Sequence, residues 1–177
     1  MRQSAKTALA GIVSALAVAI MFATTLIPFL TYALPAISGA LLILIVIEVN
    51  RKWAFASYAA VSILSFLLLN DKEAALMYIA FFGYYPVIKS MLESRLPRVV
   101  EYLVKLLLFN VSVISATLLA VFVLKIPLED VEERGPAVIP YLLLMANAMF
   151  LLYDYTLTQF VQLYLKKIQH RFRKLFR

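Results

Sequence analysis

The apolar residues of this chain fall into six long runs, and short gaps between the runs carry most of the charge. The runs do not alternate strictly between apolar and polar positions, so each is predicted to be a helix rather than a strand of a membrane barrel. A helix that crosses a bilayer needs about 20 apolar residues, which most of these runs approach or exceed. The expected helices are residues 7–30, 33–49, 53–69, 74–91, 99–124 and 136–165.

The composition indicates that hydrocarbon, rather than water, surrounds most of the chain. Of its 177 residues, 64% are hydrophobic, whereas a soluble domain has about 45–50% apolar residues. The mean hydropathy is +0.90. We therefore expect an all-α polytopic membrane protein. It would have one six-helix transmembrane domain, residues 1–165, and a basic amphipathic tail, residues 166–177, that lies against anionic lipid headgroups.

The cations are concentrated in every second gap between the runs and at the two ends. Fourteen of the 17 Lys and Arg residues lie there, and the positive-inside rule then predicts that both termini are cytoplasmic in a multi-pass protein of the cell membrane. The net charge of +7 favours contact with the membrane surface over contact with nucleic acid. These fourteen cations are Arg2, Lys6, Arg51, Lys52, Lys89, Arg95, Arg98, Lys105, Lys166, Lys167, Arg171, Arg173, Lys174 and Arg177.

Several chemistries lack the residues that they require. The chain has no cysteine, which excludes disulfides and thiolate metal sites. Its four glycines are scattered, and no phosphate-binding G-x-x-x-x-G-K-[ST] motif, H-E-x-x-H motif or G-x-S-x-G motif is present. We expect no cofactor, no metal and no enzymatic activity, and any ATP hydrolysis would have to come from a separate subunit.

The first run carries a small residue at every fourth position. Residues four apart share a helix face, so these small side chains form a flat stripe that another helix could approach closely. Two interpretations remain open at this stage, namely packing within the same bundle and docking of a partner subunit. The stripe consists of Gly11, Ala15, Ala19 and Ala23.

Polar residues on the last run lie deep in the predicted bilayer. Asp154 is about 16 Å along the helix from the boundary marked by Lys166, and an acid at such depth costs about 2.5–3.5 kcal/mol on insertion. Asn110 on the fifth run has a comparable depth, so we expect Asn110 and Asp154 to be neighbours. The pair could provide a structural hydrogen bond between two helices or the polar floor of a substrate cavity, or Asp154 could act as a proton relay.

The fourth run carries aromatic residues and a lysine on one face. Gly83 and Pro86 weaken the helix locally, because Pro86 removes one backbone hydrogen bond. A kinked helix with phenols on one side could form the wall of a site for a flat organic ligand, although ordinary aromatic packing would give the same pattern. The face consists of Tyr78, Phe82, Tyr85 and Lys89.

Taken together, these features resemble the substrate-binding S component of energy-coupling factor (ECF) vitamin transporters. The resemblance rests on six short-looped helices, the chain length and the segments 10–20 and 34–40. In that family an Ala-x-x-x-Ala pair on the first helix contacts the transmembrane coupling subunit, and Ala15 and Ala19 would occupy those positions. The resemblance implies that the chain binds a small nutrient in its outer half, topples in the membrane and releases the nutrient inward. Two ATPases and the coupling subunit would supply the energy.

In that family the ligand-binding residues come from the first loop and the later helices. Asp154 lies deeper than an outward-facing pocket would need, which is a departure from the family pattern. The residues expected to take part in substrate binding are Tyr78, Phe82, Tyr85, Asn110, Tyr141, Asn147 and Asp154.

Another class of protein fits the same pattern, namely a small scaffold subunit of a cell-envelope complex of the MreD type. The scaffold would use the small-residue stripe and the basic tail for protein contacts. It predicts a dry core between the fourth, fifth and sixth helices, whereas a solute-binding subunit predicts an outward-open pocket lined by Tyr78, Tyr85, Tyr141 and Asn147. A membrane-embedded enzyme without a familiar motif is a third interpretation.

Overall fold

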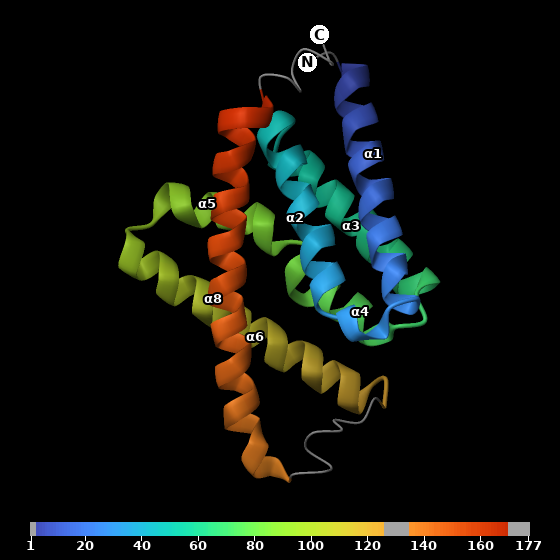
Figure 1. Cartoon of the computed structure of the whole chain (residues 1–177), viewed down its shortest axis with the longest axis vertical. Helices are drawn as coiled ribbons and strands as arrows, with labels where there is room; N and C mark the ends of the chain where they lie inside the picture. The colour runs from blue at the N-terminus through green and yellow to red at the C-terminus, as the bar shows by residue number, and fades with distance from the viewer. Residues whose placement is uncertain (1–2, 126–134, 170–177) are drawn as a thin grey trace.

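The computed structural model describes residues 3–125 and 135–169, and every regular element in these ranges is helical (Figure 1). The prediction of an all-α membrane bundle is confirmed. The α-helices in the described ranges are α1 (Gln3–Phe22), α2 (Ala33–Glu48), α3 (Arg51–Leu68), α4 (Lys72–Met77), α5 (Tyr85–Arg95), α6 (Arg98–Phe122) and α8 (Ile139–Leu163). Short 3-10 turns are η1 (Ala23–Thr25), η2 (Pro28–Leu30) and η4 (Pro136–Val138), and π-helical segments are η3 (Tyr78–Phe82) and η5 (Tyr164–Ile168).

Four of these helical segments are long and apolar enough to cross a membrane, and the shorter α2 is also apolar. Their outer faces expose large apolar side chains, such as Leu107 on α6 at 66% and Leu144 on α8 at 71%. Such surfaces are stable in hydrocarbon rather than in water. The expected number of six crossings stays a prediction. The four segments are Gln3–Thr25, Lys72–Arg95, Arg98–Phe122 and Pro136–Lys167.

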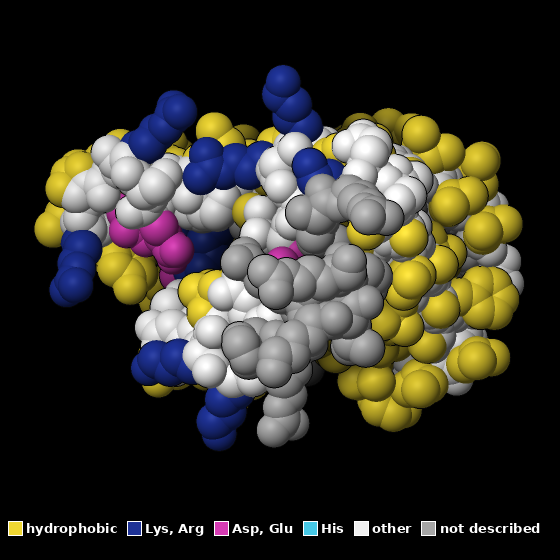
Figure 2. Space-filling model, turned by 90° about the horizontal axis from the view of Figure 1, so that it is seen from above, with side chains coloured by type: hydrophobic (Ala, Val, Ile, Leu, Met, Phe, Trp, Pro, Cys, Tyr) yellow, Lys and Arg dark blue, Asp and Glu magenta, His cyan; other side chains and the backbone are white. Residues whose placement is uncertain are grey.

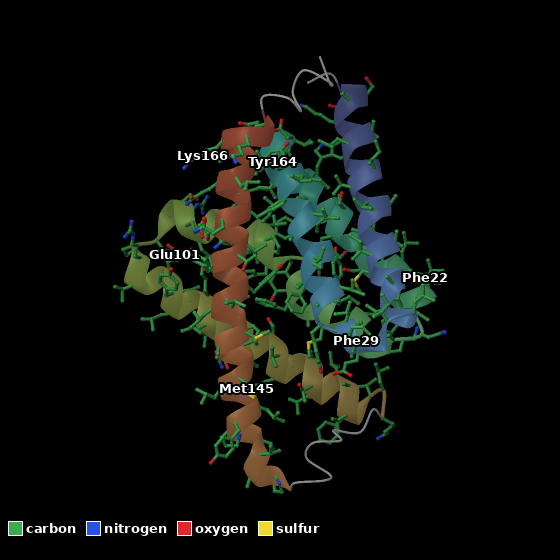
Figure 3. All side chains as sticks on the ribbon, viewed as in Figure 1. Phe22, Phe29, Glu101, Met145, Tyr164 and Lys166 are labelled. Atoms are coloured by element: carbon green, nitrogen blue, oxygen red, sulfur yellow. The ribbon has the colours of Figure 1, made fainter. Side chains whose placement is uncertain are left out.

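Helix α1 begins and helix α8 ends at the same end of the molecule (Figure 1). Lys166 lies at this end, whereas Phe22 and Phe29 lie toward the other end of α1 (Figure 3). We call it the basic end, because Lys and Arg side chains stand around its rim when it is viewed from above (Figure 2). The arrangement agrees with an even number of crossings. The predicted tail, residues 166–177, lies mostly outside the described residues.

Short polar gaps set the helix starts at both ends of the bundle. The Asn50 side chain accepts a hydrogen bond from the backbone N–H of Trp53 at 3.0 Å and caps α3. Asp71 caps α4 in the same way, through the N–H of Ala74 at 2.9 Å. Asp71 also accepts a hydrogen bond from the Thr31 hydroxyl at 2.9 Å, so the gap before α2 is tied to the gap before α4.

The chain folds into two layers that share α2. Helices α1, α2 and α3 enclose one apolar core, in which Val13, Leu42 and Ala54 are buried. Helices α5, α6 and α8 lie on the other side of α2, and α6 runs obliquely across α8 (Figure 1). The second core, on this side, is aromatic and contains Phe109 and Phe150. The segment from α4 to α5 connects the two layers.

The connecting segment is broken near Gly83 and Pro86, as the sequence indicated, but the irregular stretch begins at Tyr78, about two turns before Pro86. The N–H of Gly83 bonds the carbonyl of Tyr78 at 2.8 Å, which gives the π-helical turn η3. Pro86 has no N–H to offer the carbonyl of Phe82, which lies four residues before it. That carbonyl faces Gly39 of α2 so closely that a Cβ atom at Gly39 would collide with it. Gly39 therefore allows α2 and η3 to touch.

We predict that Gly39→Ala lowers the free energy of unfolding by about 1–3 kcal/mol, because the added methyl group overpacks a backbone contact. The measurement is an unfolding titration of the purified protein in detergent. Gly11→Ala is the matched control, since no atom lies within 4 Å of a Cβ built there, and it should change stability by no more than about 0.5 kcal/mol or raise it slightly. Equal stability of the two variants would contradict the close approach.

Candidate functional site

Five charged side chains meet where α5, α6 and α8 come together. Lys89 and Glu93 lie one turn apart on α5, and Glu101 and Lys105 lie one turn apart on α6. The turn between α5 and α6 is short, which places these two pairs side by side, and Asp154 of α8 completes the group. We call these five residues the charged cluster. Figure 3 labels Glu101, near the start of α6.

The centre of the charged cluster is the carboxylate of Asp154. Its Oδ1 atom accepts hydrogen bonds from Lys89 Nζ at 2.5 Å and from the Tyr85 hydroxyl at 2.5 Å. Its Oδ2 atom accepts a bond from Lys105 Nζ at 3.2 Å. Asp154 thus joins two lysines that belong to different helices, and all three helices are linked through one side chain.

The two lysines are linked a second time, through glutamates. Glu93 Oε1 lies 2.6 Å from Lys89 Nζ and 3.0 Å from Lys105 Nζ. Glu101 Oε1 lies 2.5 Å from Lys105 Nζ. The cluster therefore holds two positive and three negative groups, and each described lysine in it has at least two carboxylate partners.

Burial decreases from the centre of the charged cluster to its edge. The side chains of Lys105, Lys89 and Asp154 are only 1%, 4% and 5% exposed. Glu101 is 12% exposed and Glu93 is 38% exposed. Acidic side chains flanked by Lys and Arg are visible at one side of the basic end (Figure 2). The centre is closed off by protein, whereas Glu93 reaches the surface.

Burying the charged cluster costs free energy, and disrupting it destabilises the protein strongly. Ionised groups in a protein interior lose hydration, and good geometry with several hydrogen bonds is needed to compensate for this loss. Removing one partner from a buried pair typically costs about 3–5 kcal/mol, because it leaves a charge uncompensated. Within a membrane domain, ionisable residues face the bundle interior and mark functional or structural sites. The charged cluster can therefore fix three helices relative to one another.

Asn110 has a different partner from the expected one. Its amide donates to Asn147 Oδ1 at 2.8 Å, and the amide of Asn147 donates back to Asn110 Oδ1 at 3.0 Å. Each amide also donates to the carbonyl four residues before it, Leu106 and Leu143 respectively. The expected contact between Asn110 and Asp154 is wrong, because Asn147 lies two turns earlier on α8 and meets Asn110 there. The Asn110–Asn147 pair marks a second crossing contact between α6 and α8.

The aromatic face of the fourth run packs against other rings rather than around an empty space. The Phe81 and Tyr85 rings stack with their centroids 4.6 Å apart, and the Phe109 and Phe150 rings stack at the same distance. Phe81 also meets Phe109 edge to face at 5.1 Å. These side chains fill the region between α5, α6 and α8, as the packing interpretation predicted.

The structure does not bring together the four residues expected to line an outward-open pocket. Tyr78 is fully buried in a core with Ala17 of α1, whereas Tyr85 is fully buried in the aromatic core. Tyr141 is 70% exposed on α8, and Asn147 is occupied by Asn110. Phe82, which is partly buried, meets Tyr153 edge to face at 5.3 Å. A shared pocket of these four side chains is therefore not present.

The small-residue stripe of α1 faces outward. Val13, Ala17 and Met21 are buried against the neighbouring helices. The stripe lies on another side of α1, and no described residue covers it fully. Gly11, Ala15 and Ala19 are exposed, and Ala23 is partly exposed. This placement does not agree with packing inside the bundle, and docking of a partner stays a prediction.

Sequence reasoning missed Glu93 and Glu101, and it placed Lys105 among the cations that surround a gap. Two signals could have found them. Lys89 and Glu93 are four residues apart, as are Glu101 and Lys105, a spacing typical of ion pairs on one helix face. The two pairs also flank one short gap, so the helices that carry them must be adjacent.

A scan against known protein families finds no match, and no curated protein and no solved structure matches the chain. Among the described residues, no group of three or more His, Asp or Glu side chains could hold a metal ion.

We predict that Lys89 and Asp154 are energetically coupled. Lys89→Met and Asp154→Asn should each lower the free energy of unfolding in detergent by about 3 kcal/mol or more. The double variant should lose less than the sum by at least about 1 kcal/mol, because no unpaired charge remains at this contact. If a single variant fails to accumulate in the membrane, recovery of yield by the double variant tests the same coupling.

The matched control for this cycle pairs Asp154→Asn with Asn110→Ala. These two residues are not hydrogen-bonded, and their effects should add within about 0.5 kcal/mol. Additive effects for Lys89 and Asp154, or strong coupling in the control pair, would contradict the assignment of partners.

Proposed function

We propose that this chain is a membrane subunit of a heteromeric complex and that α1 is its docking helix. The observation that carries the proposal is the outward placement of Gly11, Ala15 and Ala19. Close helix approach in lipid depends on small residues, because lipid tails and apolar side chains are equally hydrophobic and only packing distinguishes them. The stripe is free for a partner helix, since the buried face of α1 holds the chain's own α2 and α3.

Within this proposal, the complex is an ECF-type importer, and the chain is its substrate-binding subunit for a vitamin or another small nutrient. Ala15 and Ala19 would contact the transmembrane coupling subunit, and two separate ATPases would supply the energy. The subunit would lie in the cell membrane with both termini in the cytoplasm. Support comes from the all-α membrane bundle, from the exposed stripe on the first helix and from the common end of α1 and α8 (Figure 1).

A nutrient site in this bundle would require the helices to separate at the end far from the charged cluster. Tyr85 and Asp154 are engaged with each other at 2.5 Å and lie among lysines, so neither is free for a ligand. Beyond Asn147, in contrast, α8 exposes Tyr141, Leu144 and Met145. The site is therefore proposed near the lower part of α8, where Figure 3 labels Met145.

The second candidate function is a scaffold subunit of a cell-envelope complex. One observation favours it specifically, namely the aromatic core between α5, α6 and α8, in which the rings of Phe81, Phe109 and Phe150 pack directly against one another. A scaffold needs the exposed stripe of α1 but no cavity.

The test is to purify the tagged chain gently from its native membrane and to identify its partners and any retained small molecule by native mass spectrometry. Ala15→Trp and Ala19→Trp should abolish co-purification of the partners, because an indole on the stripe keeps the helices apart. Leu107→Trp is the matched control. Leu107 is 66% exposed but lies on α6 and not on the docking helix, so this variant should keep the partners.

The outcomes separate the two candidates. Two ATPases with a coupling subunit and a retained nutrient support the importer, whereas cell-envelope proteins without a small molecule support the scaffold. Partners that survive both alanine substitutions would overturn docking through α1.

A further inference from the structure

A groove with apolar walls lies between α3 and α5, outside the charged cluster. Its volume is about 410 Å³. Phe55 of α3 forms one wall, and it is 37% exposed. The opposite wall comes from α5 and the residue that follows it. We call this the α3–α5 groove, and it is lined by Phe55, Ile88, Met91, Leu92, Arg95 and Leu96.

The groove opens at the level where α3 begins and α5 ends. Arg51, the first residue of α3, donates hydrogen bonds to the hydroxyl and the carbonyl of Ser90, both at 3.2 Å. These two bonds fix the start of α3 against α5. The walls are therefore held in place by a contact that does not depend on a ligand.

Two cations stand beside the α3–α5 groove at this level. Arg95 is part of its lining and is exposed. Lys52 is exposed and lies three residues before Phe55, on the same side of α3. In the described ranges, neither cation makes an ion pair with an acid. The nearby acid Glu93 is already bound to Lys89 and Lys105.

This combination fits an amphiphile with a hydrocarbon chain and an anionic headgroup. An apolar groove on a membrane-embedded surface is filled by hydrocarbon, because no water competes for it there. A guanidinium group binds phosphate oxygens through two parallel hydrogen bonds. A partner helix is a poorer fit, since the lining covers only about two turns of α5 and one side chain of α3.

We propose that the α3–α5 groove binds one acyl chain of an anionic phospholipid, and that Arg95 and Lys52 hold the phosphate of its headgroup. The site is distinct from the docking stripe on α1, and it does not depend on which partners the chain has. It gives the basic end a specific lipid contact in addition to general attraction to an anionic surface.

The test is native mass spectrometry of the purified protein titrated with phosphatidylglycerol or phosphatidylcholine of identical acyl chains. Phosphatidylglycerol should be retained more strongly. Arg95→Gln should weaken the first phosphatidylglycerol bound by about fivefold, and the Arg95→Gln, Lys52→Gln double variant should weaken it further, because each cation near the surface contributes comparably. Phosphatidylcholine binding should weaken less, because its quaternary ammonium group offsets the attraction between its phosphate and the two cations.

The matched control is Arg98→Gln. Arg98 is exposed, lies three residues after Arg95 and carries the same charge, but it is not part of the groove lining. It should leave the affinity for phosphatidylglycerol within about twofold of the unmodified protein. An equal loss in the Arg95 and Arg98 variants would show diffuse attraction and would overturn the proposal, as would equal retention of the two lipids.

The apolar part of the site is tested separately. Ile88→Trp fills the groove and should reduce retention of both lipids, with the melting temperature of the variant as a check on folding. A phosphatidylglycerol with a photoreactive acyl chain should label peptides that contain Phe55 or Met91 in the unmodified protein. Labelling confined to α6 or α8 would overturn the proposal. So would labelling of an associated protein segment that occupies the groove in place of lipid.

Discussion

The structure depends on one electrostatic constraint: a carboxylate in the middle of a membrane helix must be paired with cations from other helices. Asp154 satisfies this constraint with Lys89 and Lys105 and adds the hydroxyl of Tyr85. Because these partners come from α5 and α6, the register of α8 against both helices is fixed. A shift of α8 by even one residue would turn the carboxylate about 100° away from the lysines. The constraint thus selects one arrangement among the many that apolar packing alone would allow.

The elements of the fold could be predicted from the sequence because each rests on local information. Each of these signals affects the backbone only within a few residues of itself. The signals are the apolar runs, the capping residues Asn50 and Asp71, and the break near Pro86. The exact form of the break could not be predicted in this way. It depends on Gly39, which is more than forty residues away in the chain and allows the carbonyl of Phe82 to approach α2.

The candidate site could be predicted only in part. The position of Asp154 along the helix indicated that its carboxylate would be costly to expose to hydrocarbon. This cost explains why the side chain is buried among protein groups. Depth cannot identify partners, however, because residues at similar depth can lie on different sides of a helix. Asn110 therefore meets Asn147 instead. Lys105 also shows that a lysine near a loop in the sequence can have a buried side chain. Its side chain is 1% exposed and is turned into the bundle.

The two proposed functions differ in whether α6 and α8 ever separate, and the placement of the polar contacts limits where this can happen. The charged cluster and the Asn110–Asn147 pair hold the helices at two levels. Opening at the cluster would expose buried charges to hydrocarbon, which is costly. Beyond Asn147 the exposed residues Tyr141 and Met145 carry no such penalty. If the chain transports a nutrient, the cluster is therefore the fixed pivot and the far end of α8 is the moving part. If the chain is a scaffold, the same exposed end of α8 is a surface that a partner can cover without disturbing the core.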